Sequence, residues 1–281
     1  MIYEKNSFLN DIILMMAESS IENPRLDAKI IISHVLGCEI DKILLDPKLE
    51  VSNNQINQIN KYVERRINGE PVSRIVGKRE FWSLDFKISR ATLDPRPDTE
   101  ILLDTILKLI SPRENISILD LGTGSGCILL SLLSEYKKAI GIGLDISFEA
   151  IRIAVLNSKK LGFSNRAHFL VGNWLNPIKS KFDIIVSNPP YIKSNYFHKL
   201  QPEVKEYDPR ESLYGGIDGL DSYRLIIPMV KKKLIKGGFL VLEIGFDQKN
   251  PVKELLLSSG FDKITCHNDL SGNFRCISAS N

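Results

Sequence analysis

The chain has 281 residues, enough for one large domain and one small domain, and 43% hydrophobic with 25% charged residues is ordinary for a globular protein. Its net charge of +3 encodes no strong general attraction to nucleic acid. Charged residues interrupt the amino terminus, which argues against a signal peptide, and no apolar run reaches the ~18 to 20 residues that span a bilayer.

Residues 1–73 have the periodicity of a small helical bundle. Asn23-Pro24 predicts the cap and first turn of one helix, which we expect to end at Gly37. Ser52 begins another helical segment, closed by Gly69. Short turns join these segments, which favours an antiparallel bundle.

The charge of this bundle bears on its partners. Residues 1–75 carry nine Lys/Arg against eleven Asp/Glu, a balance of −2. A nucleic-acid recognition domain is usually basic, so this balance counts against one. The bundle either stabilises the rest of the chain or docks a protein substrate, and we favour docking.

The alternation of residues becomes strand-like after the bundle. We expect residues 74–92 to form a β-hairpin that links the bundle to a large domain at 93–281. The apolar and aromatic anchors of this hairpin are Phe81, Trp82, Leu84 and Phe86.

The next motif is Pro95-Arg96-Pro97-Asp98-Thr99-Glu100, in which prolines make the backbone rigid. Asp98 or Thr99 can cap a helix over Ile101 to Leu109. Arg96 can close over a site or bind a backbone carbonyl of a substrate; the alternative is a solvent-facing side chain.

A glycine-rich turn then follows a short apolar strand at Ser117 to Leu121. The turn is Gly122-Thr123-Gly124-Ser125-Gly126, and a helical pattern follows it. Glycines there let the backbone approach a ligand closely at the amino end of a helix. About twenty residues on, the strand Ala139 to Leu144 ends in Asp145, placed to accept from ribose hydroxyls. The spacing suits a dinucleotide as well as S-adenosylmethionine.

The loop after the next strand, His168 to Val171, favours S-adenosylmethionine. Asn173 can meet an adenine edge there, and Trp174 can pack beside the purine. The alternative for Trp174 is a core aromatic.

The tetrapeptide Asn188-Pro189-Pro190-Tyr191 follows the apolar strand Phe182 to Ser187. Two prolines cannot continue a ladder, so the strand must stop there, at the edge where open α/β sheets bind ligands. The Asn188 side chain and the Pro189 carbonyl can accept both hydrogens of a planar NH2 group, while Tyr191 offers a ring face. The alternative is a simple loop terminator.

The segments beyond the tetrapeptide complete the pattern. The polar connection 193–213 is long enough to suggest a substrate-gripping loop, with disorder as the alternative. A helix over Leu225 to Leu234 ends in a lysine run, which we interpret as a solvated helix end. Two last strands, Ile264 to His267 and Arg275 to Ala279, are typical of an antiparallel edge hairpin.

Together the motifs resemble the HemK/PrmC family of class I methyltransferases, and the resemblance spans nearly the whole chain. The segments that carry it, besides the glycine turn and the tetrapeptide, are Glu80 to Trp82, Leu93 to Glu100 and Gly215 to Leu220. One mild departure is Asn173, where an aspartate is often expected. The resemblance implies an α/β fold with a Rossmann-like, mostly parallel seven-stranded sheet and an antiparallel edge hairpin.

The resemblance also implies a function and a set of site residues. The family methylates the side-chain amide nitrogen of the glutamine in the Gly-Gly-Gln motif of class I peptide chain release factors. S-adenosylmethionine would be the methyl donor, and S-adenosylhomocysteine the product. The implied cofactor residues are Gly122, Thr123, Gly124, Ser125, Gly126, Asp145, Trp174 and Asn188. The implied substrate residues are Asn188, Pro189, Pro190, Tyr191 and Arg96, of which the first four are the catalytic set.

Three other interpretations stay open from the residues. The same tetrapeptide suits an adenine amino group, although that function predicts a basic recognition region, which the sequence lacks. A glutamine of a ribosomal protein is a second acceptor. A third possibility is a scaffold that binds the cofactor without catalysis, against which the intact tetrapeptide argues.

The cysteines bear on compartment and metal content. Cys38, Cys127, Cys266 and Cys276 lack the spacing of a zinc site, so we expect reduced thiols and no metal. Reduced thiols favour a cytoplasmic protein. We also expect a monomer that binds neither membrane nor nucleic acid directly.

Overall fold

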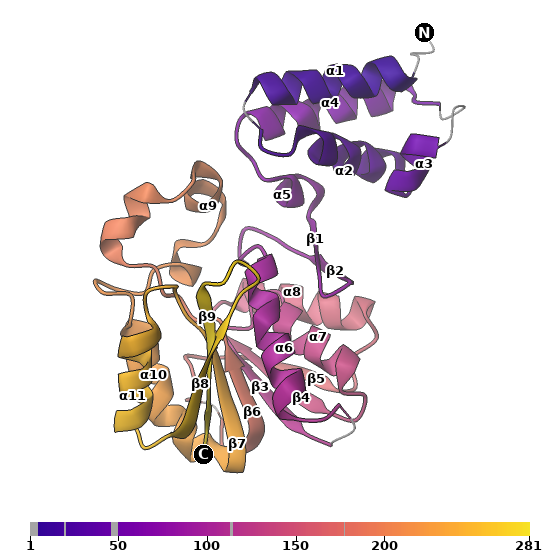
Figure 1. The fold of residues 1–281 in the computed structure, drawn as a ribbon. Helices are drawn as coiled ribbons and strands as arrows, with labels where there is room; N and C mark the ends of the chain where they lie inside the picture. The colour runs from indigo at the N-terminus through magenta and orange to yellow at the C-terminus, as the bar shows by residue number, and fades with distance from the viewer. Residues whose placement is uncertain (1–4, 20, 46–49, 113–114, 177) are drawn as a thin grey trace. The chain divides into compact units, whose positions relative to one another are not determined.

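The computed structural model describes residues 5–19, 21–45, 50–112, 115–176 and 178–281. The chain divides into two compact units, each described here by itself (Figure 1). The first holds the amino-terminal residues to Lys78 together with Gln201–Tyr207. The second holds Arg79–Leu200 and Asp208–Asn281.

The first unit is helical. Its helices are α1 (Lys5–Glu18), α2 (Pro24–Leu36), α3 (Ile40–Leu45), α4 (Asn53–Ile67), α5 (Val72–Val76) and α9 (Pro202–Tyr207). Gly37 ends α2 and Ser52 precedes α4, as the sequence predicts. Gly37 has the left-handed conformation, and Ser52 forms a complete capping box with Gln55. Asn23 precedes α2 but makes no side-chain cap hydrogen bond. The core of this unit consists of Ile12, Met16, Ala28, Ile31, Ile32, Ile43, Ile59 and Val63.

A buried cation ties α9 to this unit. Arg66 of α4 is 6% exposed. Its Nε bonds Asp27 Oδ2 of α2 at 2.6 Å, and its Nη1 bonds Glu203 Oε1 of α9 at 2.7 Å. The chain between β6 and α10 therefore leaves the second unit at residue 200 and returns to it at 208.

The second unit is built on a seven-stranded sheet with the order β5-β4-β3-β6-β7-β9-β8. Its strands are β3 (Ser117–Leu121), β4 (Ile140–Asp145), β5 (Ala167–Val171), β6 (Phe182–Ser187), β7 (Leu234–Glu243), β8 (Asp262–Asn268) and β9 (Phe274–Ser280). The first five are parallel, and β9 is antiparallel to both β7 and β8. The predicted fold class, a mostly parallel sheet with an antiparallel edge hairpin, is confirmed.

Helices cover both faces of the sheet (Figure 1). The helices of this unit are α6 (Glu100–Leu109), α7 (Cys127–Glu135), α8 (Phe148–Lys160), α10 (Asp221–Val230) and α11 (Lys249–Ser258), with short 3₁₀ segments at Pro97–Thr99, Ser194–Lys199, Arg210–Ser212 and Lys231–Lys233. One apolar cluster joins the sheet to α10 and α11, and a second joins it to α6 and α7. Successive side chains of β3 point to opposite faces of the sheet. Leu119 therefore belongs to the first cluster and Ile118 to the second.

The predicted linker hairpin is partly wrong. A two-stranded sheet does form, from β1 (Lys78–Phe81) and β2 (Leu84–Lys87), and all of it except Lys78 belongs to the second unit. However, Arg74 to Val76 lie in α5. Their β-branched neighbours favour a strand by composition, but Ile75 and Val76 are buried, and Gly77 ends the helix in the left-handed conformation. Burial thus outweighs strand propensity here.

Three smaller predictions also change. Thr99 is the residue before α6, but neither it nor Asp98 makes a side-chain cap hydrogen bond, because the Thr99 hydroxyl is used elsewhere. The connection 193–213 is not irregular throughout, since it contains α9 and two 3₁₀ segments. The predicted helix over Leu225 to Leu234 instead begins at Asp221, and its lysine run forms a 3₁₀ turn.

Replacing Arg66 tests the buried cation. Arg66→Gln should lower the unfolding free energy of the first unit by about 3 kcal/mol, the lower end for a broken buried ion pair, because Asp27 keeps other interactions. Amide hydrogen exchange should also speed up in residues 201–207. Urea unfolding and exchange mass spectrometry measure both effects.

The matched control is the neighbouring Arg65, whose bidentate pair with Glu70 is 41% exposed on the arginine side. Arg65→Gln should cost under about 1 kcal/mol. Equal costs for the two variants would contradict the role assigned to Arg66.

Candidate active site

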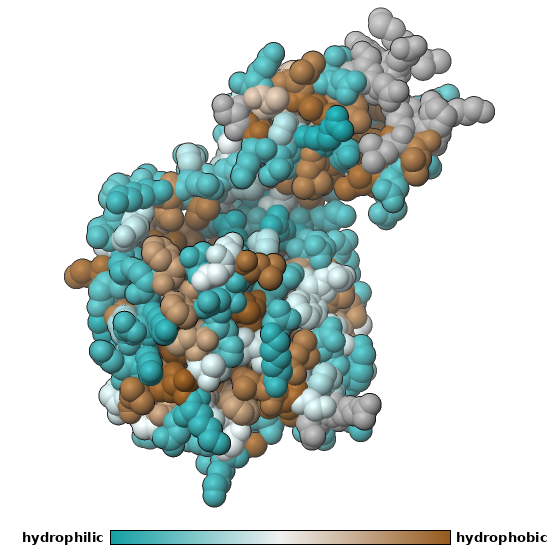
Figure 2. Space-filling view, in the orientation of Figure 1, coloured by the Kyte–Doolittle hydropathy of each residue, from teal (hydrophilic) through white to brown (hydrophobic). Residues whose placement is uncertain are grey.

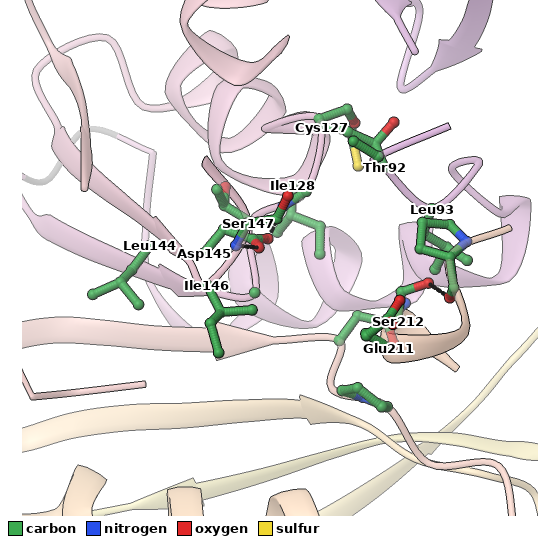
Figure 3. Close-up of a pocket in the computed structure, with 18 of the residues that line it drawn as sticks. Thr92, Leu93, Cys127, Ile128, Leu144, Asp145, Ile146, Ser147, Glu211 and Ser212 are labelled. Carbon is green, nitrogen blue, oxygen red and sulfur yellow. Dashed lines mark hydrogen bonds between the residues drawn. The ribbon is translucent and has the colours of Figure 1, made fainter. Parts of the chain in front are cut away.

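The carboxyl ends of the parallel strands meet at one edge of the sheet. Leu121 of β3 pairs with Leu144 of β4 and with Ser187 of β6, so the residues that follow these strands come together. They surround a cavity of about 640 Å³, a volume that suits a small organic ligand. Figure 3 shows Asp145, Ile146 and Ser147 on one side of it, and Leu93, Glu211 and Ser212 on the other.

The glycine turn forms the floor of this cavity. Gly122, Gly124 and Gly126 have φ angles of 72°, 55° and 81°, which side-chain-bearing residues rarely adopt. A Cβ on Gly122 or Gly124 would meet nothing within 4 Å, so their backbone faces open space. Ser125 is 2% exposed, lines the cavity, and its Oγ has no hydrogen-bond partner among the described residues. A close backbone and an unsatisfied hydroxyl are the features expected where a ligand supplies the missing partner.

The Asp145 carboxylate accepts a hydrogen bond from the glycine turn and can still accept from the hydroxyls of a ligand. Its Oδ2 accepts from the amide of Gly124 at 2.9 Å and its Oδ1 from the amide of Ser147 at 2.9 Å. Burial raises the pKa of this carboxyl, and the backbone hydrogen bonds oppose the rise. A carboxylate has about four acceptor positions, so Asp145 can still accept from a ligand hydroxyl, such as one of a ribose.

One part of the cavity wall has two hydrophobic residues. Trp174 lines the cavity and also packs partly on the core; its contact with a purine stays a prediction. Its φ of 48° is unusual for a bulky residue, and such strain concentrates at ligand sites. Ile146 is 66% exposed and lines the same cavity. Asn173 also lines the cavity, and its contact with an adenine edge stays a prediction.

The tetrapeptide begins directly after β6. Asn188 and Pro190 line the cavity together with the glycine turn, whereas Pro189 and Tyr191 are not among its lining residues. The side-chain Nδ2 of Asn188 donates to Thr99 Oγ1 at 3.2 Å. Tyr191 donates from its hydroxyl to Glu243 Oε1 at 3.1 Å, so the polar end of its ring is held away from the cavity in the sheet edge. The Tyr191 ring as a stacking face for a substrate stays a prediction.

A second glycine loop packs on the backbone of the tetrapeptide. A Cβ on Gly215 would lie 2.7 Å from Tyr191 Cα and 2.9 Å from the Pro190 carbonyl oxygen. A Cβ on Gly219 would lie 2.5 Å from the Tyr191 carbonyl oxygen. These glycines are therefore required by close approach, which explains a motif that the sequence analysis offered only as a resemblance.

The Gln248 side chain holds the backbone of the tetrapeptide and of this glycine loop by hydrogen bonds. This residue is 1% exposed, and its Nε2 donates to the carbonyl oxygens of Tyr191 and Gly219, both at 3.0 Å. Its Oε1 accepts from the amide of Gly245 at 2.9 Å. One amide side chain thus joins the tetrapeptide, the glycine loop and the end of β7.

Arg96 lies at the wall of the cavity. It lines the cavity, and its Nη2 bonds Asp208 Oδ2 at 2.5 Å. Asp208 Oδ1 also accepts from the amide of Asp94 at 3.3 Å. The pair ties the Pro-Arg-Pro motif to the segment that contributes Pro209, Glu211, Ser212 and Tyr214 to the wall. Contact between Arg96 and a substrate backbone stays a prediction.

Two fully buried carboxyls lie behind these loops. Burial raises the pKa of Asp120 to about 7, with a contribution from the nearby negative charge of Asp145, while the Thr123 hydroxyl bond at 2.6 Å opposes the rise. Burial likewise raises the pKa of Glu243 to about 7.

Sequence analysis missed Glu243, Gln248, Thr99 and Ile146 as site residues. Glu243 offered one signal, as the polar last residue of an apolar strand, whereas Gln248 and Ile146 offered none.

The residues fit a nucleoside-containing cofactor, and nothing in the described chain supplies a metal site. Among residues 5–19, 21–45, 50–112, 115–176 and 178–281, no group of three or more His, Cys, Asp or Glu side chains is placed to hold a metal ion. Within the same ranges, no helix is long and apolar enough to cross a membrane.

Comparison with known proteins agrees with the fold. The catalytic domain of hMettl16, solved with the MAT2A 3′UTR hairpin 1, superposes with a TM-score of 0.59 at 16% identity, and 84% of each chain is covered. A methyltransferase from Pyrococcus furiosus gives a TM-score of 0.52 at 18% identity, over 70% of this chain and 88% of the other. The T. thermophilus 16S rRNA methyltransferase RsmC, solved with AdoMet and guanosine, gives 0.51 at 17% identity, over 73% and 49%. The chain therefore shares the fold of these methyltransferases.

Sequence comparison gives the family. The PrmC N-terminal domain matches residues 8–77, and the methyltransferase small domain matches residues 80–201. The release factor glutamine methyltransferase of Agrobacterium fabrum is 41% identical over 263 residues, covering 92% of this chain and 91% of that protein. The protein of the same name from Rhodospirillum rubrum is 43% identical over 261 residues, covering 93% and 80%. The chain belongs to the release factor glutamine methyltransferase family, as its motifs predicted.

Adding a methyl to Gly215 tests the close approach. Gly215→Ala must displace the Tyr191 backbone, so methyl transfer should fall at least about tenfold, because small misplacements of reacting groups cost large factors in rate. Affinity for S-adenosylhomocysteine should change less than about threefold, since the glycine turn is separate. Steady-state kinetics and calorimetry give the two values. Gly162→Ala introduces backbone strain at a φ of 79° but no close contact, since no atom lies within 4 Å of its Cβ position; it should leave both values unchanged.

The buried Asp120 predicts a pH dependence of stability. Its pKa is raised in the folded protein, so its stabilising contribution is complete below about pH 4 and is lost as the pH rises through about 7. Between pH 5 and pH 8 the loss should be about 2 to 3 kcal/mol from this group. Asp120→Asn should remove that part of the slope, while Glu243 retains its own part in the same direction. Urea unfolding at the two pH values measures the slope, and identical slopes for both proteins would contradict the burial effect.

Proposed function

We propose that this protein transfers a methyl group from S-adenosylmethionine to the side-chain amide nitrogen of a glutamine in a class I peptide chain release factor, at its Gly-Gly-Gln motif. The observation that carries the proposal is the position of Asn188. Its amide nitrogen is occupied by Thr99, so its oxygen remains for a ligand in the same cavity that the glycine turn lines. The names of the close relatives support a release factor glutamine as the acceptor.

The cofactor would be held by residues already placed around the cavity. Gly122, Thr123, Gly124 and Ser125 would contact it through the turn, Asp145 through its ribose hydroxyls, and Trp174 beside its purine. Gly126 is not among the lining residues and packs near Ala154 and Leu130, so its role would be to shape the turn. When bound, S-adenosylmethionine supplies an electrophilic sulfonium methyl carbon.

The chain itself contributes position and desolvation. Asn188 Oδ1 and the Pro189 carbonyl would accept the two hydrogens of the glutamine NH2, which turns the nitrogen lone pair toward the methyl carbon. A new N–C bond forms as the S–C bond breaks, and the nitrogen becomes cationic. It then loses a proton to water, so the site needs no general base.

The first unit is proposed to dock the protein substrate. Its net charge of −2 over residues 1–75 does not suit nucleic acid. Exposed apolar side chains on its helices offer contact area to a protein: Leu14, Met15, Leu26 and Leu45.

Labelled S-adenosylmethionine tests the acceptor. Purified release factor, ribosomal proteins and DNA are offered separately, and the labelled residue is mapped by mass spectrometry. Label on the glutamine of the release factor supports the proposal. Label confined to a ribosomal protein or to adenine would replace it with that acceptor.

Removing the Asn188 side chain tests the carrying observation. Asn188→Ala should lower the transfer rate at least about a hundredfold, since it removes an acceptor bond to the reacting nitrogen. Affinity for S-adenosylhomocysteine should stay within a few-fold. Asn165→Ala, on an exposed turn before β5, is the matched control and should behave as the unmodified protein. Unchanged turnover in Asn188→Ala would remove this residue from the mechanism.

A further inference from the structure

Asn157 of α8 makes a set of buried hydrogen bonds that the proposed function does not yet use. The residue is fully buried. Its Oδ1 accepts from the amide of Lys87 at 2.7 Å, and its Nδ2 donates to the Lys87 carbonyl oxygen at 2.9 Å. The same Nδ2 donates to the Ser125 carbonyl oxygen at 2.8 Å. Both hydrogens of this side-chain amide are therefore engaged, and it joins two segments that are distant in the sequence.

The bonds to Lys87 fix the end of β2. This strand lies beside α8 (Figure 1). An amide side chain carries both a donor and an acceptor, so it can pair with both backbone groups of one residue, as a neighbouring strand does. The chain that leaves β2 at Lys87 lines the cavity from Arg90 to Leu93. Asn157 therefore fixes the point from which this wall of the cavity starts.

The bond to Ser125 fixes the glycine turn. Ser125 is 2% exposed, lines the cavity, and lies between two glycines with positive φ angles, Gly124 and Gly126. Glycine backbone is conformationally permissive, so a bond to the carbonyl between them restricts the turn. The helix α8 also packs closely on this turn, because a Cβ on Gly126 would lie 3.3 Å from Ala154 Cβ. One face of α8 thus supports the turn through Ala154 and Asn157.

The three bonds require the chemistry of an asparagine. An aspartate has the same size, but when ionised it has no donor and would place a negative charge against two carbonyl oxygens. An alanine would leave the Lys87 amide and both carbonyl oxygens without this partner in a buried place, which is costly. Either change should let the glycine turn and the wall after β2 move relative to each other.

We propose that Asn157 is a positioning residue for the methyl donor, which sets the glycine turn and the wall after β2 at the spacing that the cofactor requires. The proposal rests on the proposed function, since that function places the cofactor in this cavity. Asn157 itself is not among the lining residues, so it acts through Ser125 and Lys87. The tetrapeptide is held by another amide, that of Gln248. Asn157 therefore acts on cofactor binding and not on the acceptor.

The helix α8 offers a matched control one turn further along. Lys160 Nζ donates to the Asp85 carbonyl oxygen at 2.9 Å, so this side chain also bonds α8 to β2. The bond is exposed, and within the described part of the chain Lys160 makes no bond to the glycine turn. Lys160→Gln therefore weakens the attachment of β2 without releasing Ser125.

The first experiment measures cofactor binding by calorimetry. Asn157→Ala and Asn157→Asp should each weaken the binding of S-adenosylhomocysteine at least about tenfold, which lies within the range for buried groups left unpaired. Lys160→Gln should stay within about threefold of the unmodified enzyme. Urea unfolding of each variant measures stability separately, so a loss of affinity is not confused with a loss of folded protein.

The second experiment separates positioning from a purely structural role by kinetics with the release factor. The KM for S-adenosylmethionine should rise at least about tenfold in both Asn157 variants, because a loss of uniform binding raises KM. The kcat and the KM for the release factor should stay within about threefold. A variant that only folds less well would instead lower kcat and leave KM unchanged, because its folded molecules would be normal.

Unchanged affinity for S-adenosylhomocysteine in Asn157→Ala would overturn the positioning role, even if that variant unfolds more easily. Asn157→Ala decides the question alone if Asn157→Asp does not fold. An equal loss of affinity in Lys160→Gln would also overturn the role, because attachment of β2 would then explain the effect.

The same measurements separate this role from the proposed function. If the unmodified enzyme bound no S-adenosylhomocysteine, the proposed function and the role of Asn157 would both fail. If it bound this cofactor product but labelled no release factor glutamine, only the proposed acceptor would fail. The affinities of the variants would then still decide the role of Asn157.

Discussion

The site depends on the parallel pairing of β3 with both β4 and β6. That register places the residues after Leu121, Leu144 and Ser187 at one edge of the sheet, although they are far apart in the sequence. The glycine turn, Asp145 and the tetrapeptide each begin where a strand ends. A one-residue slip in a strand would reverse its inward and outward faces, so the two apolar clusters that cover the sheet also hold the site in register.

Behind this edge the fold keeps polar groups that a core would normally exclude. Asp120 and Glu243 are fully buried, and burial raises the pKa of each to about 7. Gln248 is equally buried but satisfies its amide with three backbone groups. The two carboxyls reduce stability at neutral pH, whereas Gln248 does not. The buried carboxyls thus lower the stability of the fold while they lie behind the loops that face the cavity. Such a loss of stability is common at functional sites.

The strands, the glycine turn and the tetrapeptide could be predicted because their signals are local. The run Phe182 to Ser187 is apolar throughout and stops at two prolines, and β6 has the same bounds. The start of α4 at Ser52 is likewise a local signal, since the capping box joins Ser52 to Gln55, three residues on. Predictions failed where partners distant in sequence decide the outcome. Val72 to Val76 forms a helix because burial outweighs strand propensity.

Thr99 and Glu243 could not be predicted as site residues for the same reason: their partners are distant in the sequence. Thr99 resembles an ordinary helix cap, but its hydroxyl meets Asn188, 89 positions away. Glu243 looks like the polar end of an apolar strand, and only the fold brings it to Tyr191. The assignment of α9 to the first unit could not be predicted either. It depends on the pairing of Arg66 with Glu203, which are 137 positions apart.

A structure of the enzyme with S-adenosylhomocysteine and a release factor tests the central claim most directly. The account predicts the glutamine nitrogen within hydrogen-bond distance of Asn188 Oδ1, at about 2.7 to 3.2 Å, and facing the sulfur of the cofactor product. A glutamine bound outside the cavity, or one that meets Asn188 through its carbonyl oxygen, would contradict it.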